Sequence, residues 1–147
     1  MENNKFNQSE QIGRDKFTKW INNNCNVCTK ITYADNEYSS WDVAYLSGET
    51  RVIVEIKDRK VNHDEYYTFL GENVKLKKLQ KLKEEDKVDK IIYFNSFSDD
   101  IIRTWDITEY TPFITYKKAL PKTTDGNNTK VLKDVYDLYS EDSIIYK

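Results

Sequence analysis

Two acidic residues and one lysine occupy matching positions in two neighbouring segments that are typical of extended chain. Asp42 lies within residues 38–46, and Glu55 and Lys57 lie within residues 50–58. Paired carboxylates beside an amine can hold a divalent cation against a phosphate, or they can form a partly buried ion cluster. The register between the two segments decides whether these side chains can act together.

The short link between the two segments predicts that register. Gly48 and Glu49 fit the centre of a type II′ turn, which favours glycine at its first central position. Counting away from the turn predicts the pairs Ser47–Thr50, Leu46–Arg51, Ala44–Ile53 and Asp42–Glu55. Directly opposed residues of antiparallel strands share a face, with Cβ atoms about 4.5–5.5 Å apart. Lys57 lies two residues beyond Glu55 and therefore shares that face.

Two opposed carboxylates repel each other unless a positive charge lies between them. Lys57 can supply that charge, which would make the three residues a structural ion cluster. The alternative is a hard cation such as Mg²⁺ or Mn²⁺, which takes carboxylate oxygens, water and substrate phosphate as ligands. Such a metal would polarise a phosphodiester and lower the pKa of a bound water. Lys57 would then orient that water or stabilise charge on the phosphorus.

A further carboxylate lies on the inner face of the first predicted helix, residues 8–23. Apolar and small residues at helical spacing define its buried stripe: Phe6, Gly13, Phe17, Trp20 and Ile21. Glu10 falls on the same stripe. Because burying an unpaired carboxylate is costly, we expect Glu10 to face the metal.

The elements that must position these residues begin with that helix and three extended segments. The segments are expected at residues 29–34, 38–46 and 50–58. The run Val52-Ile53-Val54 is apolar on both faces, which is typical of a central strand in a covered sheet.

The second half of the chain continues the alternation of helices and strands. A helix at 65–86 is followed by strands at 90–94 and 101–107, an extended segment at 110–118 and a loop at 121–128. The apolar side of that helix carries Phe69, Leu76, Leu79 and Leu82. A last helix is expected at 129–140 from the spacing of Val131, Leu132, Val135, Leu138 and Tyr139. This order predicts an α/β fold with a central mixed β-sheet flanked by helices.

The amino-acid composition limits the classes of protein to which the chain can belong. The chain has 147 residues, 33% of them charged and 38% apolar, which suits one domain over residues 1–147. Lys and Arg total 23 against 25 Asp and Glu, so the net charge of −2 excludes binding of nucleic acid by bulk charge. No apolar run reaches the roughly 20 residues that span a bilayer. The N-terminal sequence MENNKFNQSE lacks a signal-peptide pattern, so we expect a cytoplasmic protein without a membrane partner.

Cys25 and Cys28 form a lone C-x-x-C pair. A structural zinc site usually needs four ligands, and the single histidine, His63, is distant in the sequence. The spacing also suits a redox pair, although the surroundings do not resemble those of thioredoxin. We favour the interpretation that both residues are ordinary reduced thiols.

Lysines crowd the second predicted helix and offer a local basic patch. Lys77, Lys78 and Lys81 cluster on one flank of the helical wheel, where they would bind DNA phosphates or form an ordinary solvated face. Lys75 falls among the leucines instead. It would either extend outward to solvent or reach the edge of the sheet that carries Glu55.

The pattern of Asp42 followed by Glu55-Ile56-Lys57 resembles that of the PD-(D/E)XK nuclease superfamily. Over residues 8–107 the order of elements is similar to the restriction-endonuclease-like αβββαβ core, with residues 108–147 as a C-terminal extension. The same pattern of an acidic residue, any residue and a lysine recurs at residues 58–60 and 85–87. Only residues 55–57 combine this pattern with a core strand and an upstream aspartate in register. One departure is Trp41, which stands where the superfamily often has proline.

The resemblance implies a Mg²⁺-dependent phosphodiesterase that acts on DNA. It implies that Asp42 and Glu55 are metal ligands, often together with the backbone carbonyl of Ile56. Lys57 would be the catalytic lysine, and Glu10 resembles the acidic residue that many members carry on their first helix.

Two classes of function follow from these patterns. A chain this short resembles small structure-specific enzymes such as Holliday junction resolvases, which cut branched DNA as homodimers, and residues 108–147 are the expected interface. The Lys-, Asn-, Ile- and Tyr-rich composition suits a bacterium or phage with an AT-rich genome. The competing hypothesis is a catalytically silent binding or structural module with the same fold, which the net acidity of the chain favours.

Overall fold

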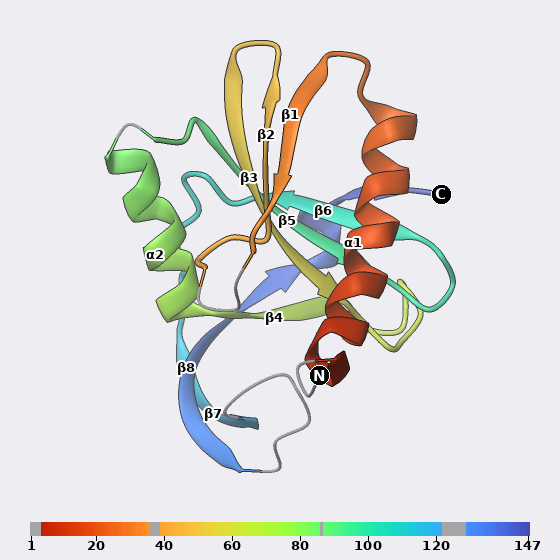
Figure 1. Ribbon diagram of the computed structural model, residues 1–147. Coiled ribbons are helices and arrows are strands. Elements are labelled where there is room, and N and C mark those ends of the chain that lie inside the picture. The colour runs from red at the N-terminus through yellow and green to blue at the C-terminus, as the bar shows by residue number, and fades with distance from the viewer. Residues whose placement is uncertain (1–3, 36–38, 86, 122–128) are drawn as a thin grey trace.

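A central mixed β-sheet with a helix on each face organises the protein (Figure 1). The computed structural model describes residues 4–35, 39–85, 87–121 and 129–147, with the backbone alone for residues 4–9. Helix α1 (Asn4–Asn24) packs on one face of the sheet. Helix α2 (Asn73–Glu84) packs on the other face together with a smaller, three-stranded sheet. The predicted α/β class with a mixed central sheet is therefore confirmed.

The six strands of the central sheet lie in the order β1, β2, β3, β5, β6 and β9. Their bounds are Cys28–Tyr33, Val43–Ser47, Thr50–Asp58, Lys90–Ser96, Ile102–Asp106 and Ile144–Tyr146. Neighbouring strands are antiparallel except for β3 and β5, which are parallel and are connected through β4 and α2. The apolar run of β3 is buried, as its sequence predicts for a central strand.

Helix α1 lies close to β3. Phe17 and Ile21 belong to the apolar cluster between this helix and the sheet, which confirms the predicted buried stripe at these positions. Gly13 lies where a Cβ atom would come within 2.8 Å of Ile56 Cγ2. The predicted contribution of Phe6 falls on a side chain outside the described residues. The close approach at Gly13 places the start of α1 beside the end of β3 that carries Glu55 and Lys57.

The smaller sheet lies on the α2 side in the order β4, β8 and β7. These strands span Thr68–Glu72, Lys130–Tyr139 and Tyr116–Pro121, and a short 3₁₀ helix, η1 (Ser140–Asp142), follows β8. Tyr136 and Leu138 of β8 share an apolar cluster with Leu76 and Leu79 of α2 and with Trp105 of β6. The C-terminal segment is thus part of the core.

The predicted helix at 129–140 is wrong, because this segment forms strand β8. Its apolar residues fit helical spacing, but β8 pairs with β4 on one side and with β7 on the other. One partner, β4, is distant in the sequence, and the other, β7, is the strand that directly precedes β8. Tertiary pairing therefore overrides a spacing that is compatible with a helix.

The second predicted helix begins later than expected. Residues 68–72 form β4, so Phe69 packs from a strand, and the helix spans Asn73–Glu84 rather than 65–86. Gly71 pairs with Tyr136, and a Cβ atom at Gly71 would overlap the Tyr136 ring. The extended segment was predicted at 110–118, but the strand found here, β7, begins later and ends at Pro121. Residues 122–128 of the predicted loop lie outside the described residues.

Cys25 and Cys28 form a disulfide, so the interpretation as reduced thiols is wrong. The Cys25 N–H donates to the carbonyl of Ile21 at the end of α1, and β1 begins at Cys28. The tight link between the helix and the strand brings the two sulfur atoms together.

None of the helices in the described part of the chain is long and apolar enough to cross a membrane.

Candidate active site

The β2–β3 hairpin has the register that the sequence predicts. Ser47 pairs with Thr50, Leu46 with Arg51 and Ala44 with Ile53. Gly48 has a φ of +63°, which the first central position of a type II′ turn requires. The last ladder pair is Val43–Val54. Asp42 lies just beyond it, and its N–H donates to the Val54 carbonyl over 2.9 Å.

The Asp42 carboxylate is held against the backbone of β3. Its Oδ2 accepts the N–H of Ile56 over 2.7 Å. Burial raises the pKa of Asp42, the hydrogen bond from Ile56 lowers it, and the nearby Glu10 charge raises it further, with a net upward shift. Because this hydrogen bond engages Oδ2, the Asp42 side chain is held beside the part of β3 that carries Glu55.

Glu55 is the most buried carboxylate of the site, with 8% of the residue exposed. Its Oε2 lies 4.0 Å from Lys57 Nζ and 3.6 Å from Lys75 Nζ. Both distances exceed the roughly 2.7–2.9 Å of a charge-assisted hydrogen bond. Burial and the Asp42 charge raise the pKa of Glu55 to about 7, against the lowering effect of the two lysines. The cations near Glu55 therefore compensate its charge only in part.

Lys75 reaches this carboxylate from the first turn of α2, which is the second of the two orientations left open by the sequence. Burial lowers its pKa, but the charges of Glu55, Glu72 and Asp42 outweigh that effect and raise it. Lys77, Lys78 and Lys81 lie exposed further along the helix. The structure thus brings Lys75, but not these three lysines, into contact with Glu55.

Glu10 lies partly buried on α1 and has a partner of its own. Its Oε1 is 3.8 Å from Arg14 Nη2, one turn further along the helix. Burial raises the pKa of Glu10, Arg14 lowers it, and the charge of Glu55 raises it again, so that the net shift is upward. Glu10 therefore lies in the electrostatic field of the Glu55 site, and Arg14 offsets part of its charge.

Glu10, Asp42 and Glu55 lie in one electrostatic neighbourhood. Burial gives Glu10, Asp42 and Glu55 raised pKa values although Arg14 and the lysines oppose the shift. Three carboxylates therefore lie near three basic side chains here, Arg14, Lys57 and Lys75, and burial is the main cause of the raised pKa values. Carboxylate oxygens are among the ligands that Mg²⁺ and Mn²⁺ take in proteins.

A cavity of about 170 Å³ opens beside Glu55, between the central sheet, α2 and the smaller sheet. The Arg59 side chain forms part of its wall. It donates from Nε to Asn95 Oδ1 over 2.7 Å, and from Nη2 to the Leu70 carbonyl and the Tyr93 hydroxyl, each over 3.0 Å. These bonds connect the end of β3 to β4 and β5, so the cavity wall is held by hydrogen bonds.

The sequence interpretation missed the residues of this cavity. Arg59 follows Lys57 by two residues, and strand alternation alone places it on the same side. Tyr136 and Lys133 also line the cavity, but they belong to the segment that was interpreted as a helix. The strand pairing of β8 was the missing signal.

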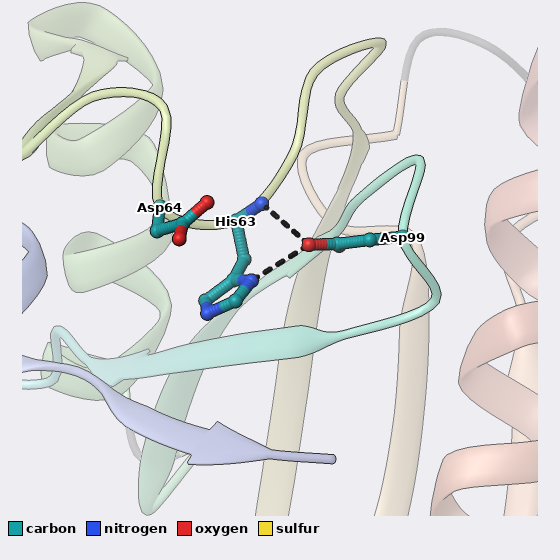
Figure 2. Close-up of side chains that lie close together, drawn as sticks. All are labelled: His63, Asp64 and Asp99. Atoms are coloured by element: carbon teal, nitrogen blue, oxygen red, sulfur yellow. Dashed lines mark hydrogen bonds and ion pairs between the residues drawn. The ribbon is translucent and has the colours of Figure 1, made fainter.

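A second group of titratable residues lies where the loop between β3 and β4 meets the loop between β5 and β6. Figure 2 shows the His63 ring turned toward Asp99, with Asp64 beside it. His63 Nδ1 is 2.7 Å from Asp99 Oδ2, which also accepts the His63 N–H over 3.2 Å. The His63 carbonyl accepts a hydrogen bond from Arg103 Nε over 3.0 Å. These hydrogen bonds fix the loop between β3 and β4 to the central sheet and explain why the three residues lie together.

No protein-family model matches the chain, and no curated protein matches it.

Proposed function

We propose that the protein is a Mg²⁺- or Mn²⁺-dependent DNA endonuclease of the PD-(D/E)XK type. The observation that carries the proposal is the meeting of Asp42, Glu55 and Lys57 at one end of a hairpin whose turn sets their register. The succession of α1, the β1–β3 meander, α2 and a parallel β5 supports it, with β4 as an insertion before α2.

Asp42 and Glu55 are the proposed metal ligands, with the Ile56 carbonyl and Glu10 as further candidates. A bound cation would polarise the phosphodiester and supply a water of lowered pKa. Lys57 lies beside Glu55 and would stabilise negative charge on the phosphate oxygens. Lys75 would bring a second ammonium to the same phosphate from α2. The hydrogen bond from Ile56 keeps Asp42 oriented without substrate.

The proposed substrate is DNA, either duplex or branched. A junction resolvase has to cut two strands, so this version of the proposal includes a homodimer. The exposed Lys77, Lys78 and Lys81 are proposed contacts to phosphates outside the site, where a local patch would offset the net charge of −2.

The test is cleavage of supercoiled plasmid, branched junctions and single strands in Mg²⁺ or Mn²⁺, with EDTA as the metal-free control. We expect Glu55→Gln and Lys57→Ala to reduce the rate by about 100-fold or more. Glu49→Gln changes an exposed carboxylate in the turn of the same hairpin and should cleave at the wild-type rate. Cleavage that persists in both site variants would refute the proposal.

The second candidate is a catalytically silent module. The observation that favours it is that Lys57 and Lys75 both lie within 4.0 Å of Glu55 Oε2, an arrangement that can serve as a structural ion cluster. In that case the wild-type protein should cut none of the substrates and should not bind Mn²⁺ in calorimetry.

A further inference from the structure

The cavity beside Glu55 has more cationic than anionic side chains in its wall. The charged residues that line it are Lys57, Arg59, Lys75, Lys133, Glu55 and Glu72. Four cations against two carboxylates leave a surplus of two positive charges when both carboxylates are ionised. Apolar side chains such as Leu79 and Leu120 form other parts of the wall. Their low polarisability strengthens the attraction between this surplus and an anion in the cavity.

Arg59 is the cation of this wall that is held in place without a carboxylate. Its guanidinium donates from Nε and Nη2 to three neutral acceptors, the Asn95 amide oxygen, the Leu70 carbonyl and the Tyr93 hydroxyl. Within the described part of the chain it forms no ion pair, and Nη1 donates to no protein acceptor. Nη1 is not one of the buried polar atoms without a partner, so it reaches solvent. The guanidinium is therefore fixed, and one nitrogen with two N–H groups remains for a ligand.

Two lysines approach the same cavity from other elements. Lys133 of β8 has its Nζ 3.4 Å from Glu72 Oε1, and Lys75 of α2 has its Nζ 3.6 Å from Glu55 Oε2. Both distances exceed the roughly 2.7–2.9 Å of a charge-assisted hydrogen bond. Together with Arg59, which directly follows β3, these ammonium groups surround the cavity with cations from three elements.

The volume and the charge of the cavity favour a small oxyanion as its ligand. About 170 Å³ is well below the roughly 300–1,000 Å³ of pockets that hold drug-sized ligands. The planar fork of arginine matches the oxygens of a phosphate. A phosphodiester inside a strand has one negative charge and a sugar on both sides. A terminal phosphate monoester has close to two negative charges and a sugar on one side, so the charge surplus and the small volume both favour the monoester.

We propose that this cavity binds the terminal phosphate of a DNA strand and that Arg59 holds it. The inference rests on the proposed nuclease function and specifies its substrate class as DNA with a phosphorylated strand end, at a break or a nick. Glu55 and Lys57 line the same cavity. A terminal phosphate at Arg59 therefore brings the phosphodiesters next to that end close to the proposed metal ligands.

The test measures binding rather than cleavage. Thymidine oligonucleotides with fluorescein on an internal base carry a phosphate at one end, a phosphate at the other end, or hydroxyls at both ends. They are titrated in Ca²⁺ and separately in EDTA, where no metal can hold the phosphate. We expect one phosphorylated form to bind the wild-type protein about 10-fold to about 150-fold more tightly than the hydroxyl form, the range for a hydrogen bond to a charged group. Inorganic phosphate should compete with that form.

Arg59→Gln removes the positive charge at the proposed contact, and we expect it to lose the advantage of the phosphorylated form. Arg51→Gln is the matched control, because Arg51 lies on β3 and pairs with Asp89 outside the cavity. This control should keep the advantage.

Glu72→Gln tests the charge balance with the opposite sign and serves also if Arg59→Gln fails to fold. It removes a carboxylate from the cavity and releases Lys133 from its ion pair. The Glu72 side chain makes no capping hydrogen bond at the start of α2, so the helix does not depend on it. We expect the phosphorylated form to bind Glu72→Gln about 2-fold to 5-fold more tightly than it binds the wild-type protein.

Equal affinity of the wild-type protein for the phosphorylated and hydroxyl forms would overturn the inference, even if inorganic phosphate binds. An advantage that survives in folded Arg59→Gln, or that is lost equally in Arg51→Gln, would also overturn it. So would a Glu72→Gln protein that binds the phosphorylated form no more tightly than the wild type.

The proposed function fails separately. A phosphate advantage without Mg²⁺-dependent cleavage of any substrate would keep the phosphate site and remove the nuclease. Mg²⁺-dependent cleavage together with equal affinity for the phosphorylated and hydroxyl forms would keep the nuclease and remove the phosphate site.

Discussion

At the scale of single residues, Glu55 is a buried carboxylate whose two neighbouring lysines do not outweigh the effect of burial on its pKa. Its pKa is raised to about 7 by burial and by Asp42, although Lys57 and Lys75 oppose the shift. A buried carboxylate of this kind costs stability when it is ionised in the metal-free protein. In the proposed nuclease, the same group would gain a favourable partner from a bound divalent cation. Stability and metal binding would then be linked through the protonation of Glu55.

The first prediction concerns stability and pH. The pKa of Glu55 rises from 4.5 to about 7 on folding, so its contribution to stability is fully present below pH 4.5 and is lost as the pH rises through 7. We expect metal-free Glu55→Gln to match the wild-type protein at pH 4.5 and to be more stable by up to about 3 kcal/mol at pH 8. Urea unfolding across this range checks the difference, and an equal gain from Glu49→Gln would contradict the assignment.

The second prediction concerns metal affinity. A cation needs the ionised carboxylate, so binding must displace the proton from Glu55. We expect the affinity for Mn²⁺ to rise about tenfold per pH unit up to pH 7, where the pKa of Glu55 lies, and to level off above it. Calorimetry in two buffers of different ionisation enthalpy measures the released proton. A flat affinity between pH 5 and 8 would show that Glu55 is not a ligand.

The third prediction separates the chemical and structural roles of Asp42. Asp42→Asn keeps an oxygen that can accept the Ile56 N–H, whereas Asp42→Ala leaves this donor without its partner. We expect cleavage to be lost in both variants, but only Asp42→Ala should be destabilised, by about 1–3 kcal/mol. Thermal unfolding of the metal-free proteins distinguishes the two. Equal destabilisation of Asp42→Asn would identify Asp42 as a structural ion partner instead.

At the scale of elements, the site depends on how closely α1 approaches β3. Gly13 permits this approach, because its missing Cβ leaves room for the Ile56 side chain. Ile56 lies between Glu55 and Lys57 in the sequence. A shift of α1 that moves Ile56 would therefore also move these two side chains. The helix also carries Glu10 toward the same end of β3.

The fourth prediction tests this packing. A change from glycine to alanine inside a helix normally stabilises it by about 1 kcal/mol. We expect Gly13→Ala to destabilise the protein instead, by about 1–3 kcal/mol, because the new methyl would lie 2.8 Å from Ile56 Cγ2. Denaturant unfolding provides the measurement, with the exposed Lys19→Ala on the same helix as control. In the double variant Gly13→Ala with Ile56→Ala, the two effects should be less than additive.

Local patterns predicted the elements whose contacts are local. The β2–β3 register followed from one turn, and the buried face of α1 followed from the spacing of Gly13, Phe17 and Ile21. Strand β8 was not predicted in this way, because its apolar residues also fit helical spacing and one of its two partners, β4, is distant in the sequence. The cavity was missed for the same reason, since Tyr136 reaches it only through that pairing.

At the scale of the whole molecule, residues 108–147 complete the core instead of extending it. Strand β8 is the central strand of the smaller sheet, and β9 forms one edge of the larger one. Val135, Tyr136 and Leu138 are each at most 3% exposed. Removing this segment would uncover α2 and β4 together.

The fifth prediction follows from that arrangement. A chain that ends at residue 107 contains the whole region of nuclease resemblance, yet it lacks β8, the partner of β4, and β9, one of the two neighbours of β6. We expect it to lose cooperative thermal unfolding, because an exposed apolar face and unpaired strands remain. A truncated chain that unfolds with the sharpness of the full protein, measured by calorimetry, would contradict the prediction. A chain that ends at residue 143, which lacks only β9, is the milder control.

The position of β8 has a consequence for synthesis on the ribosome. The hairpin that carries Asp42, Glu55 and Lys57 leaves the exit tunnel long before β8 does, and the nascent chain can form it early. The wall that contains Tyr136 exists only after β8 has left the tunnel as well. A newly made chain would therefore form the hairpin that carries the carboxylates before the wall that encloses the cavity beside them.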